Sequence, residues 1–175
     1  MLVGLPGVGK TSVGREVARR LGRTFVDLDA EIERSFDKSV SRIFADEGEP
    51  VFRNAEAAVT QEVARRAAAV ISPGGGWIMN RPATAHLLDN SRIIYLRVSP
   101  ETAVRRMGRG IARRPLFSDA ADPNGTMMRL FEERGPRYEE FAWLTVETTG
   151  TGRSQVISRV VEEVLAAERN VEGSG

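Results

Sequence analysis

Residues 4–11 read Gly-Leu-Pro-Gly-Val-Gly-Lys-Thr and match the pattern G-x-x-x-x-G-K-[ST] at every fixed position. The two apolar residues before this run predict the end of a strand. Val13, Val17 and Leu21, spaced four apart, predict a helix with one buried face. A strand, a glycine-rich loop and a helix in this order form the context that a phosphate-binding loop requires. This context disfavours the alternative, a glycine turn that ends in Lys-Thr by chance.

The chemistry of the predicted loop follows from its residue types. Glycines allow successive backbone N–H groups to point at one phosphate chain, and the helix N-terminus adds its dipole. The ammonium group of Lys10 can reach the terminal phosphates, and the hydroxyl of Thr11 can bind the accompanying magnesium. ATP and Mg2+ are therefore the predicted cofactors. The predicted nucleotide-binding residues of the loop are Gly7, Val8, Gly9, Lys10, Thr11 and Ser12.

The composition narrows the possible functions of the chain. Its 175 residues fit one domain with a proper core, and 41% apolar and 28% charged residues are ordinary values for a globular protein. A net charge of +1 gives no reason to expect nucleic acid or a membrane as a partner. The absence of cysteine excludes thiol catalysis and disulfides and favours the cytoplasm, and the single His86 argues against a histidine-based metal site. No apolar run is long enough to span a membrane, no signal peptide is visible, and we expect a monomer.

Predicted strands and helices alternate along the chain. We expect strands at 2–3, 24–27, 70–72, 92–98 and 144–148, and helices at 10–21, 29–36, 39–47, 49–69, 82–88, 100–108, 126–141 and 154–169. We expect the helix at 126–141 to be interrupted near Gly135 and Pro136. Alternation of this kind indicates a three-layer α/β/α fold around a five-stranded parallel sheet.

The same pass along the chain predicts one domain over residues 1–169. Residues 109–125 contain glycine, proline and several arginines and are expected to form a long loop or lid. Residues 170–175 are expected to form a disordered tail. A first strand of two or three residues is unusually short, so we expect that the natural N-terminus lies further upstream.

Asp27 and Asp29 follow the second predicted strand. Alternation along an extended chain places both side chains on the same side, and the carboxyl ends of parallel strands form the ligand crevice of α/β sheets. One carboxylate suits magnesium, and the other can accept a hydrogen bond from a substrate hydroxyl and direct its attack on the γ-phosphate. A structural role remains open, because Asp29 is also suited to cap the helix that follows.

Two further features point to a substrate site. Arg53 can hold a carboxylate in bidentate fashion, although most helical arginines lie on solvated faces. The run Gly74-Gly75-Gly76 after a short strand indicates close approach of the backbone to a ligand, and its alternative is a flexible turn.

A cluster of arginines lies in and before the predicted lid. Its members are Arg105, Arg106, Arg109, Arg113 and Arg114. A nucleic-acid patch is one interpretation, but the balanced net charge favours a lid arginine that neutralises the transferring phosphate. Arg105 and Arg106 are interpreted as ordinary helix surface.

In combination, these motifs resemble those of shikimate kinase, a family of the nucleoside monophosphate kinase-like group, over residues 2–169. The resemblance rests on an ordered series: the phosphate loop, D-x-D at Asp27 and Asp29, I-F-x-x-x-G-E-x-x-F-R-x-x-E from Ile43 to Glu56, G-G-G at 74–76, R-P-L from Arg114, and R-x-x-x-Y from Arg134 to Tyr138.

The resemblance implies ATP-dependent phosphorylation of the shikimate 3-hydroxyl. It assigns catalysis to Lys10, Asp29 and Arg114 and places magnesium on Thr11 and Asp27. The implied nucleotide contacts outside the loop are Arg114 and Arg153. The implied substrate contacts are Asp29, Arg53, Gly74, Gly75, Gly76 and Arg134, with Phe44, Phe52 and Leu116 as the apolar wall of the pocket.

Some positions depart from the family pattern. Ser72-Pro73 before the glycines and Trp77 after them could alter the wall of the substrate pocket, and residues 148–153 match the adenine loop poorly. Two alternatives to a shikimate kinase remain. One is a related kinase that acts on gluconate or a nucleotide, and the other is a non-catalytic, ligand-sensing relative.

Overall fold

The computed structural model describes residues 1–66, 68–88, 91–113, 115–117 and 120–172. The strands are β1 (Leu2–Val3), β2 (Thr24–Asp27), β3 (Ala69–Ser72), β4 (Ile94–Arg97) and β5 (Leu144–Glu147). The α-helices are α1 (Lys10–Leu21), α2 (Leu28–Phe36), α3 (Val40–Asp46), α4 (Glu49–Ala64), α5 (Arg81–Thr84), α6 (Pro100–Met107), α7 (Pro123–Phe141) and α8 (Arg153–Glu172). Short 3-10 helices span Trp77–Met79, Gly108–Arg113 and Pro115–Phe117.

Every strand pairing is parallel, as predicted for an α/β fold. In the described residues the backbone ladders join β1, β4 and β5 in that order and join β2 to β3 separately. Residues of β1 and β3 lie close to each other without a ladder between them. In the described residues the predicted single five-stranded sheet therefore appears as a three-stranded and a two-stranded group.

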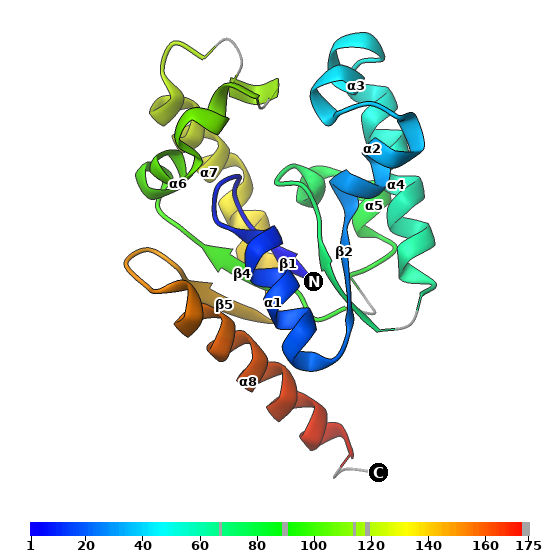
Figure 1. Cartoon of the computed structure of the whole chain (residues 1–175), viewed down its shortest axis with the longest axis vertical. Coiled ribbons are helices and arrows are strands. Elements are labelled where there is room, and N and C mark those ends of the chain that lie inside the picture. The colour runs from blue at the N-terminus through cyan, green and yellow to red at the C-terminus, as the bar shows by residue number, and fades with distance from the viewer. Residues whose placement is uncertain (67, 89–90, 114, 118–119, 173–175) are drawn as a thin grey trace.

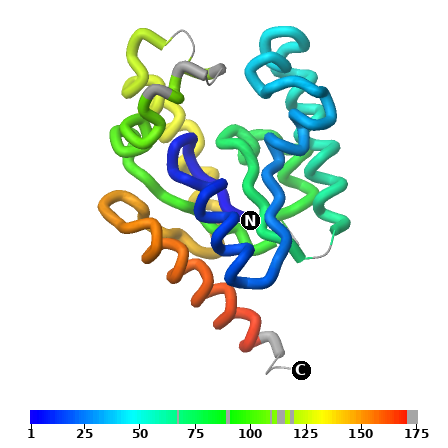
Figure 2. Tube along the Cα trace, viewed as in Figure 1, coloured from blue at the N-terminus to red at the C-terminus, as the bar shows by residue number. Residues whose placement is uncertain are grey.

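Helices cover both sides of the strands. α1 and α8 lie on one side and α7 passes behind β1 and β4 (Figure 1). Above the strands the chain forms two lobes: α2, α3 and α4 in one, and α6 with the start of α7 in the other (Figure 2). The lobes meet where α3 contacts the 3-10 helix Pro115–Phe117. Among the described residues, no helix combines the length and the apolar character that a membrane span needs.

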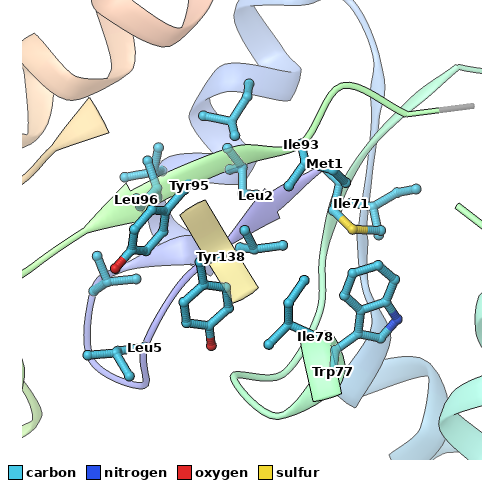
Figure 3. Packing of buried hydrophobic residues seen from close by; sticks show 14 of the residues in the cluster. Met1, Leu2, Leu5, Ile71, Trp77, Ile78, Ile93, Tyr95, Leu96 and Tyr138 are labelled. Atoms are coloured by element: carbon cyan, nitrogen blue, oxygen red, sulfur yellow. The ribbon is translucent and has the colours of Figure 1, made fainter. Parts of the chain in front are cut away.

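The core forms where the strands meet α7 and the chain after β3. Tyr95 of β4 stacks on Tyr138 of α7 with ring centroids 5.0 Å apart, and Leu96 beside it is fully buried. Trp77 and Ile78 close the other end of this cluster (Figure 3). Burial raises the pKa of the Tyr95 hydroxyl to about 12 and also raises that of Tyr138, so both rings stay neutral at physiological pH.

Local sequence signals explain most helix ends. Gly22 ends α1 in a left-handed conformation, and the hydroxyl of Ser39 accepts from the N–H of Arg42 to cap α3. The cap of α2 is Asp27, whose carboxylate accepts from the N–H of Ala30, so the open interpretation of Asp29 as the cap is wrong.

Several predicted boundaries differ from those observed. α4 ends at Ala64 rather than 69, and the helix predicted at 82–88 is reduced to α5 followed by turns. α7 begins at Pro123 and continues through Pro136 without the predicted interruption. The predicted lid contains two 3-10 helices, and α8 extends to Glu172, into the predicted tail.

We expect Leu96→Ala to lower the free energy of unfolding by about 2–5 kcal/mol, because it leaves a cavity beneath a fully buried strand residue. Urea denaturation followed by circular dichroism measures this change. Leu165→Ala is the matched control, since Leu165 on α8 is 39% exposed and its loss should have little effect. Equal losses in the two variants would contradict the assigned core.

Candidate active site

The phosphate loop joins β1 to α1, and its backbone demands glycine. Gly7 and Gly9 have φ angles of 82° and 99°, in the region that disfavours other residues. A Cβ atom on Gly7 would lie 2.5 Å from the carbonyl oxygen of Ala103. The ammonium of Lys10 donates to the carbonyls of Gly4 and Leu5 at 2.9 and 3.2 Å and so lies along the loop.

A carboxylate–hydroxyl pair lies beside this loop. The hydroxyl of Thr11 donates to Oδ2 of Asp27 at 2.9 Å, which joins the first turn of α1 to the end of β2. Both groups offer the hard oxygen atoms that magnesium prefers. In the described parts of the chain no group of three or more His, Cys, Asp or Glu side chains could hold a metal. A magnesium ion here would therefore depend on phosphate oxygens and water for its other ligands.

Asp29 lies in the first turn of α2, close to the loop. Its Oδ1 atom is buried and has no hydrogen-bond partner among the described residues. Burial, followed by the negative charges of Asp27 and Glu56, raises the pKa of Asp29 to about 6, and the charge of Lys10 acts in the opposite direction. A carboxyl group with this pKa can exchange a proton near neutral pH, which is the property a general base needs.

The glycine segment (residues 74–76) runs between Asp29 and Arg53. A Cβ on Gly74 would lie 2.8 Å from Oδ1 of Asp29, and a Cβ on Gly76 would lie 2.6 Å from Nη2 of Arg53. The hydroxyl of Tyr138 donates to the carbonyl oxygen of Gly75 and fixes the segment from the α7 side. The glycines therefore allow the backbone to approach both charged side chains.

Two arginines face the same cavity from different helices. Arg53 on α4 donates from Nη1 to Oε2 of Glu56 at 2.9 Å and from Nε and Nη2 to Glu49 at 3.1 Å. Burial is the largest single effect and lowers the pKa of Arg53, but the charges of Glu56 and Glu49 and the hydrogen bonds to them together outweigh it, so the net pKa is raised. Arg134 on α7 is 5% exposed, and its buried Nε and Nη1 atoms have no partner in the described part of the chain.

These residues line one cavity of about 680 Å3. Its walls include Asp29, Arg53, Glu56, Arg134, the glycine segment, and the apolar side chains Phe44, Phe52 and Leu116. Apart from the Tyr95 hydroxyl, the buried side-chain atoms that lack a partner among the described residues all belong to Asp29, Glu56 and Arg134. Buried charge without a partner is costly, so the cavity is suited to a ligand with both negative charge and hydroxyl groups.

A second cavity, of about 570 Å3, lies along the phosphate loop and is lined by Lys10, Thr11 and Asp27. Pro6, Asp29, Glu33, Gly74 and Gly75 line both cavities. The two spaces therefore meet at Asp29.

A third space, of about 300 Å3, lies on the other side of the loop. It is lined by Gly7, Val8, Gly9 and Ser12 of the loop and by Arg106, Thr148 and Arg153. Arg153, which the resemblance assigned to the nucleotide, thus lies beside the loop. Arg114 lies outside the described residues.

Comparison with known proteins agrees with this geometry. The shikimate kinase family model matches residues 6–165. The chain is 40% identical to a shikimate kinase of Chromobacterium violaceum (94% of this chain and 88% of that protein) and 40% identical to one of Thermobifida fusca (95% of each). Among solved structures, shikimate kinase from Acinetobacter baumannii in complex with shikimate superposes with a TM-score of 0.89 at 36% identity, over 95% of this chain and 92% of that one.

The chain belongs to the shikimate kinase family. The prediction of an ATP-dependent phosphotransferase with an alcohol acceptor is thereby confirmed at the level of the family.

Sequence reasoning misassigned some residues of this shikimate kinase family member. Arg106, interpreted as ordinary helix surface, donates to the hydroxyl and carbonyl of Thr148 at 3.0 and 2.6 Å and lines the space beside the loop. Trp77, expected to alter the substrate pocket, is fully buried and does not line that cavity, and Pro73 lines only the phosphate-loop cavity. The helical period of α6 could have shown that Arg105 and Arg106 point in different directions.

Glu56 and Asn80 are also part of the site. Glu56 belongs to a motif that the sequence shows, but its burial and its contact with Arg53 depend on how α4 packs. Asn80 carries no sequence signal of its own, because its contacts join two segments that are 24 or more residues apart.

We expect Asp29→Asn to stabilise the fold at neutral pH and to do so much less in acid. The pKa of Asp29 is raised in the folded state, so between about pH 4 and pH 6 the folded chain binds more protons than the unfolded chain. Wild-type stability therefore falls as pH rises through this window, by on the order of 2 kcal/mol, and the amide removes this loss. Urea denaturation at about pH 4.5 and pH 8 measures the difference.

Asp37→Asn is the control for loss of one carboxylate, because Asp37 is exposed at the end of α2 in a left-handed conformation that asparagine also adopts. An equal gain from Asp29→Asn at both pH values would contradict the assigned environment of Asp29.

Proposed function

We propose that the chain transfers the γ-phosphate of ATP to the 3-hydroxyl of shikimate. The observation that carries this proposal is the meeting of two cavities at Asp29. One cavity presents the phosphate loop. The other presents Arg53 and Arg134, whose Nε and Nη1 atoms have no partner in the described residues. A small acid with several hydroxyls would neutralise the arginines at one end and bring a hydroxyl to Asp29 at the other.

At the acceptor end, the chain's own side chains bind and orient. Arg53 and Arg134 hold the carboxylate, and the backbone at Gly75 and Gly76 contacts ring hydroxyls. Phe44, Phe52 and Leu116 cover the apolar side of the ring and exclude water. Asp29 accepts the proton of the attacking hydroxyl, a role consistent with its raised pKa.

At the donor end, the phosphate loop holds the nucleotide. The N–H groups of Gly7, Val8 and Gly9 and the ammonium of Lys10 bind the phosphates, Ser12 adds a contact, and Arg114 would neutralise the transferring phosphate. Thr11 and Asp27 would hold magnesium, which when bound with ATP neutralises charge on the phosphate oxygens. Arg106 and Arg153 lie beside the loop on the side suited to the base of the nucleotide.

Broader features of the protein are part of the same proposal. We expect a single kinase domain over 1–169 with its lid near 109–125, a monomer in the cytoplasm, and a small-molecule substrate with no nucleic-acid or membrane partner. We also expect β3 to lie next to β1 in one continuous five-stranded sheet, which their proximity supports.

The function is tested by coupled ADP release with shikimate, gluconate and nucleoside monophosphates as separate acceptors. We expect turnover with shikimate alone. Gluconate also carries a carboxylate and hydroxyls, but it is an extended chain with no apolar face to lie against Phe44, Phe52 and Leu116, and nucleoside monophosphates lack the carboxylate. Asp29→Asn should abolish turnover and leave ATP binding intact, since it removes the base without touching the loop. Turnover with gluconate or a nucleotide instead would indicate a related kinase, and no turnover with any acceptor would indicate a sensor.

Arg134→Ala should raise KM for shikimate by about 30-fold or more and leave KM for ATP nearly unchanged, because it removes a buried partner of the carboxylate. Initial rates against each substrate measure the two constants. Arg129→Ala on the same helix is the matched control, since Arg129 is exposed and its guanidinium donates to the nearby hydroxyl of Thr126. A similar rise in both variants would contradict a specific role for Arg134.

A further inference from the structure

The chain after the glycine segment forms a short strap (residues 77–80) against α4. The strap comprises the 3-10 helix Trp77–Met79 and Asn80, and it has two polar attachments to α4. The indole N–H of Trp77 donates to the hydroxyl of Thr60 at 3.1 Å, and that hydroxyl donates to the carbonyl of Glu56 at 2.6 Å. Asn80 makes the other attachment, one turn nearer to the substrate cavity.

The amide of Asn80 contacts two acceptors at once. Nδ2 donates to Oε2 of Glu56 at 2.8 Å and to the carbonyl oxygen of Arg53 at 2.9 Å, and the residue is 8% exposed. A carbonyl oxygen and an ionised carboxylate can only accept, so the nitrogen of the amide must face them, and both of its hydrogens are used. One side chain thus holds the backbone of Arg53 and the carboxylate that binds the Arg53 guanidinium.

Glu56 is the centre of this arrangement. It is 1% exposed, and its Oε2 atom accepts from both Arg53 Nη1 and Asn80, whereas Oε1 has no partner in the described residues. A buried carboxylate needs donors, and Asn80 supplies one that is neutral. Without the donor from Asn80, Glu56 would compete more strongly with the substrate carboxylate for the guanidinium of Arg53.

The guanidinium of Arg53 bridges two carboxylates of different character. Nη1 contacts buried Glu56, while Nε and Nη2 contact Glu49, whose side chain is 61% exposed. Its position over Gly76 is so close that a Cβ there would lie 2.6 Å from Nη2. The strap that carries Asn80 therefore directly continues the glycine segment over which the guanidinium of Arg53 lies.

We infer that Asn80 is a positioning residue for the carboxylate end of the substrate. It acts through Glu56 and through the backbone of Arg53, and it orients the Arg53 guanidinium toward the cavity before substrate binds. This inference rests on the proposed function. Asn80 lines neither the substrate cavity nor the phosphate-loop cavity, so its effect on binding is indirect.

The role predicts a separation between binding and chemistry. Loss of the Asn80 donors misplaces Arg53 and weakens the hold on the substrate carboxylate. Asp29, Lys10 and the phosphate loop are untouched, so the rate at saturating substrate and the affinity for ATP should change little. A strap that served only to stabilise the fold would produce no such separation.

The test compares two substitutions in the same strap: Asn80→Asp, which keeps the shape of the side chain, and Trp77→Phe, which keeps an aromatic ring but loses the indole N–H and some buried volume. Asn80→Asp replaces the donor by an acceptor and should raise KM for shikimate about tenfold or more, with kcat and KM for ATP within about threefold of wild type. Trp77→Phe removes the hydrogen bond to Thr60 and should lower Tm with KM for shikimate unchanged. Steady-state kinetics and thermal unfolding by circular dichroism provide both readouts.

Exchange of donor and acceptor gives a second test. In the double variant Asn80→Asp with Glu56→Gln, the new amide at position 56 can donate to the new carboxylate at position 80. The pair again holds one negative charge. KM for shikimate in the double variant should therefore be lower than that of Asn80→Asp by about threefold or more. Asn80→Ser, which adds no charge, should raise KM for shikimate without a matching loss of kcat and serves if Asn80→Asp does not fold.

Three results would overturn the inference. A wild-type KM in the folded Asn80 variants would exclude a role in binding. An equal rise in KM for shikimate in Trp77→Phe would show that the strap has only a structural role. If KM did not recover in the double variant, Asn80 would not act through Glu56. A wild-type chain that is inactive on shikimate would overturn the proposed function and this inference with it, and the same assay reports that outcome first.

Discussion

The junction between β2 and α2 places the two aspartates, Asp27 and Asp29, at the centre of the site. The strand ends at Asp27 and the helix begins at Leu28 with no intervening loop. Asp27 caps the helix and accepts from the hydroxyl of Thr11, which ties it to the phosphate loop. Asp29, two residues later, is consequently carried to the point where the two cavities meet. The register of this one turn therefore sets the distance between nucleotide and acceptor.

The acceptor cavity is built at a cost to the fold. Asp29, Glu56 and Arg134 each hold buried atoms without partners in the described residues, and such atoms oppose folding. The surrounding contacts offset this cost: Tyr138 holds Gly75, Asn80 holds Glu56, and Tyr95 stacks on Tyr138. Rigid support on several sides holds Asp29, Arg134 and the Arg53–Glu56 pair in fixed positions before a ligand binds.

Local sequence determined much of the fold in advance. The phosphate loop, the end of α1 at Gly22 and the cap at Ser39 depend on nearby residues and were predictable. α7 was not, because tertiary packing of Met127, Leu130 and Tyr138 on one face carries the helix through Pro136 against its local preference. The split of the strands into two ladders likewise depends on distant pairing that no local pattern records.

The candidate site divides in the same way. Asp29, Arg53, Arg134 and the three glycines belong to recognisable motifs, and the structure brings them to one cavity. Arg106 and Asn80 were missed, since their importance comes from contacts with Thr148 and Glu56 across the fold. Trp77 shows the opposite outcome. The sequence marks it as an unusual residue beside the glycine motif, but the structure buries it in the core, where it does not line the cavity.

The buried guanidinium of Arg134, whose Nε and Nη1 atoms have no partner in the described residues, also limits what can compete for this cavity. A neutral mimic of the substrate could accept hydrogen bonds from these atoms but would leave the buried positive charge uncompensated, and so would lose affinity. The cavity therefore favours anionic inhibitors. The negative charge that increases an inhibitor's affinity also slows its diffusion across a lipid membrane. High affinity for the isolated enzyme and efficient entry into a cell therefore place opposite demands on the charge of the inhibitor.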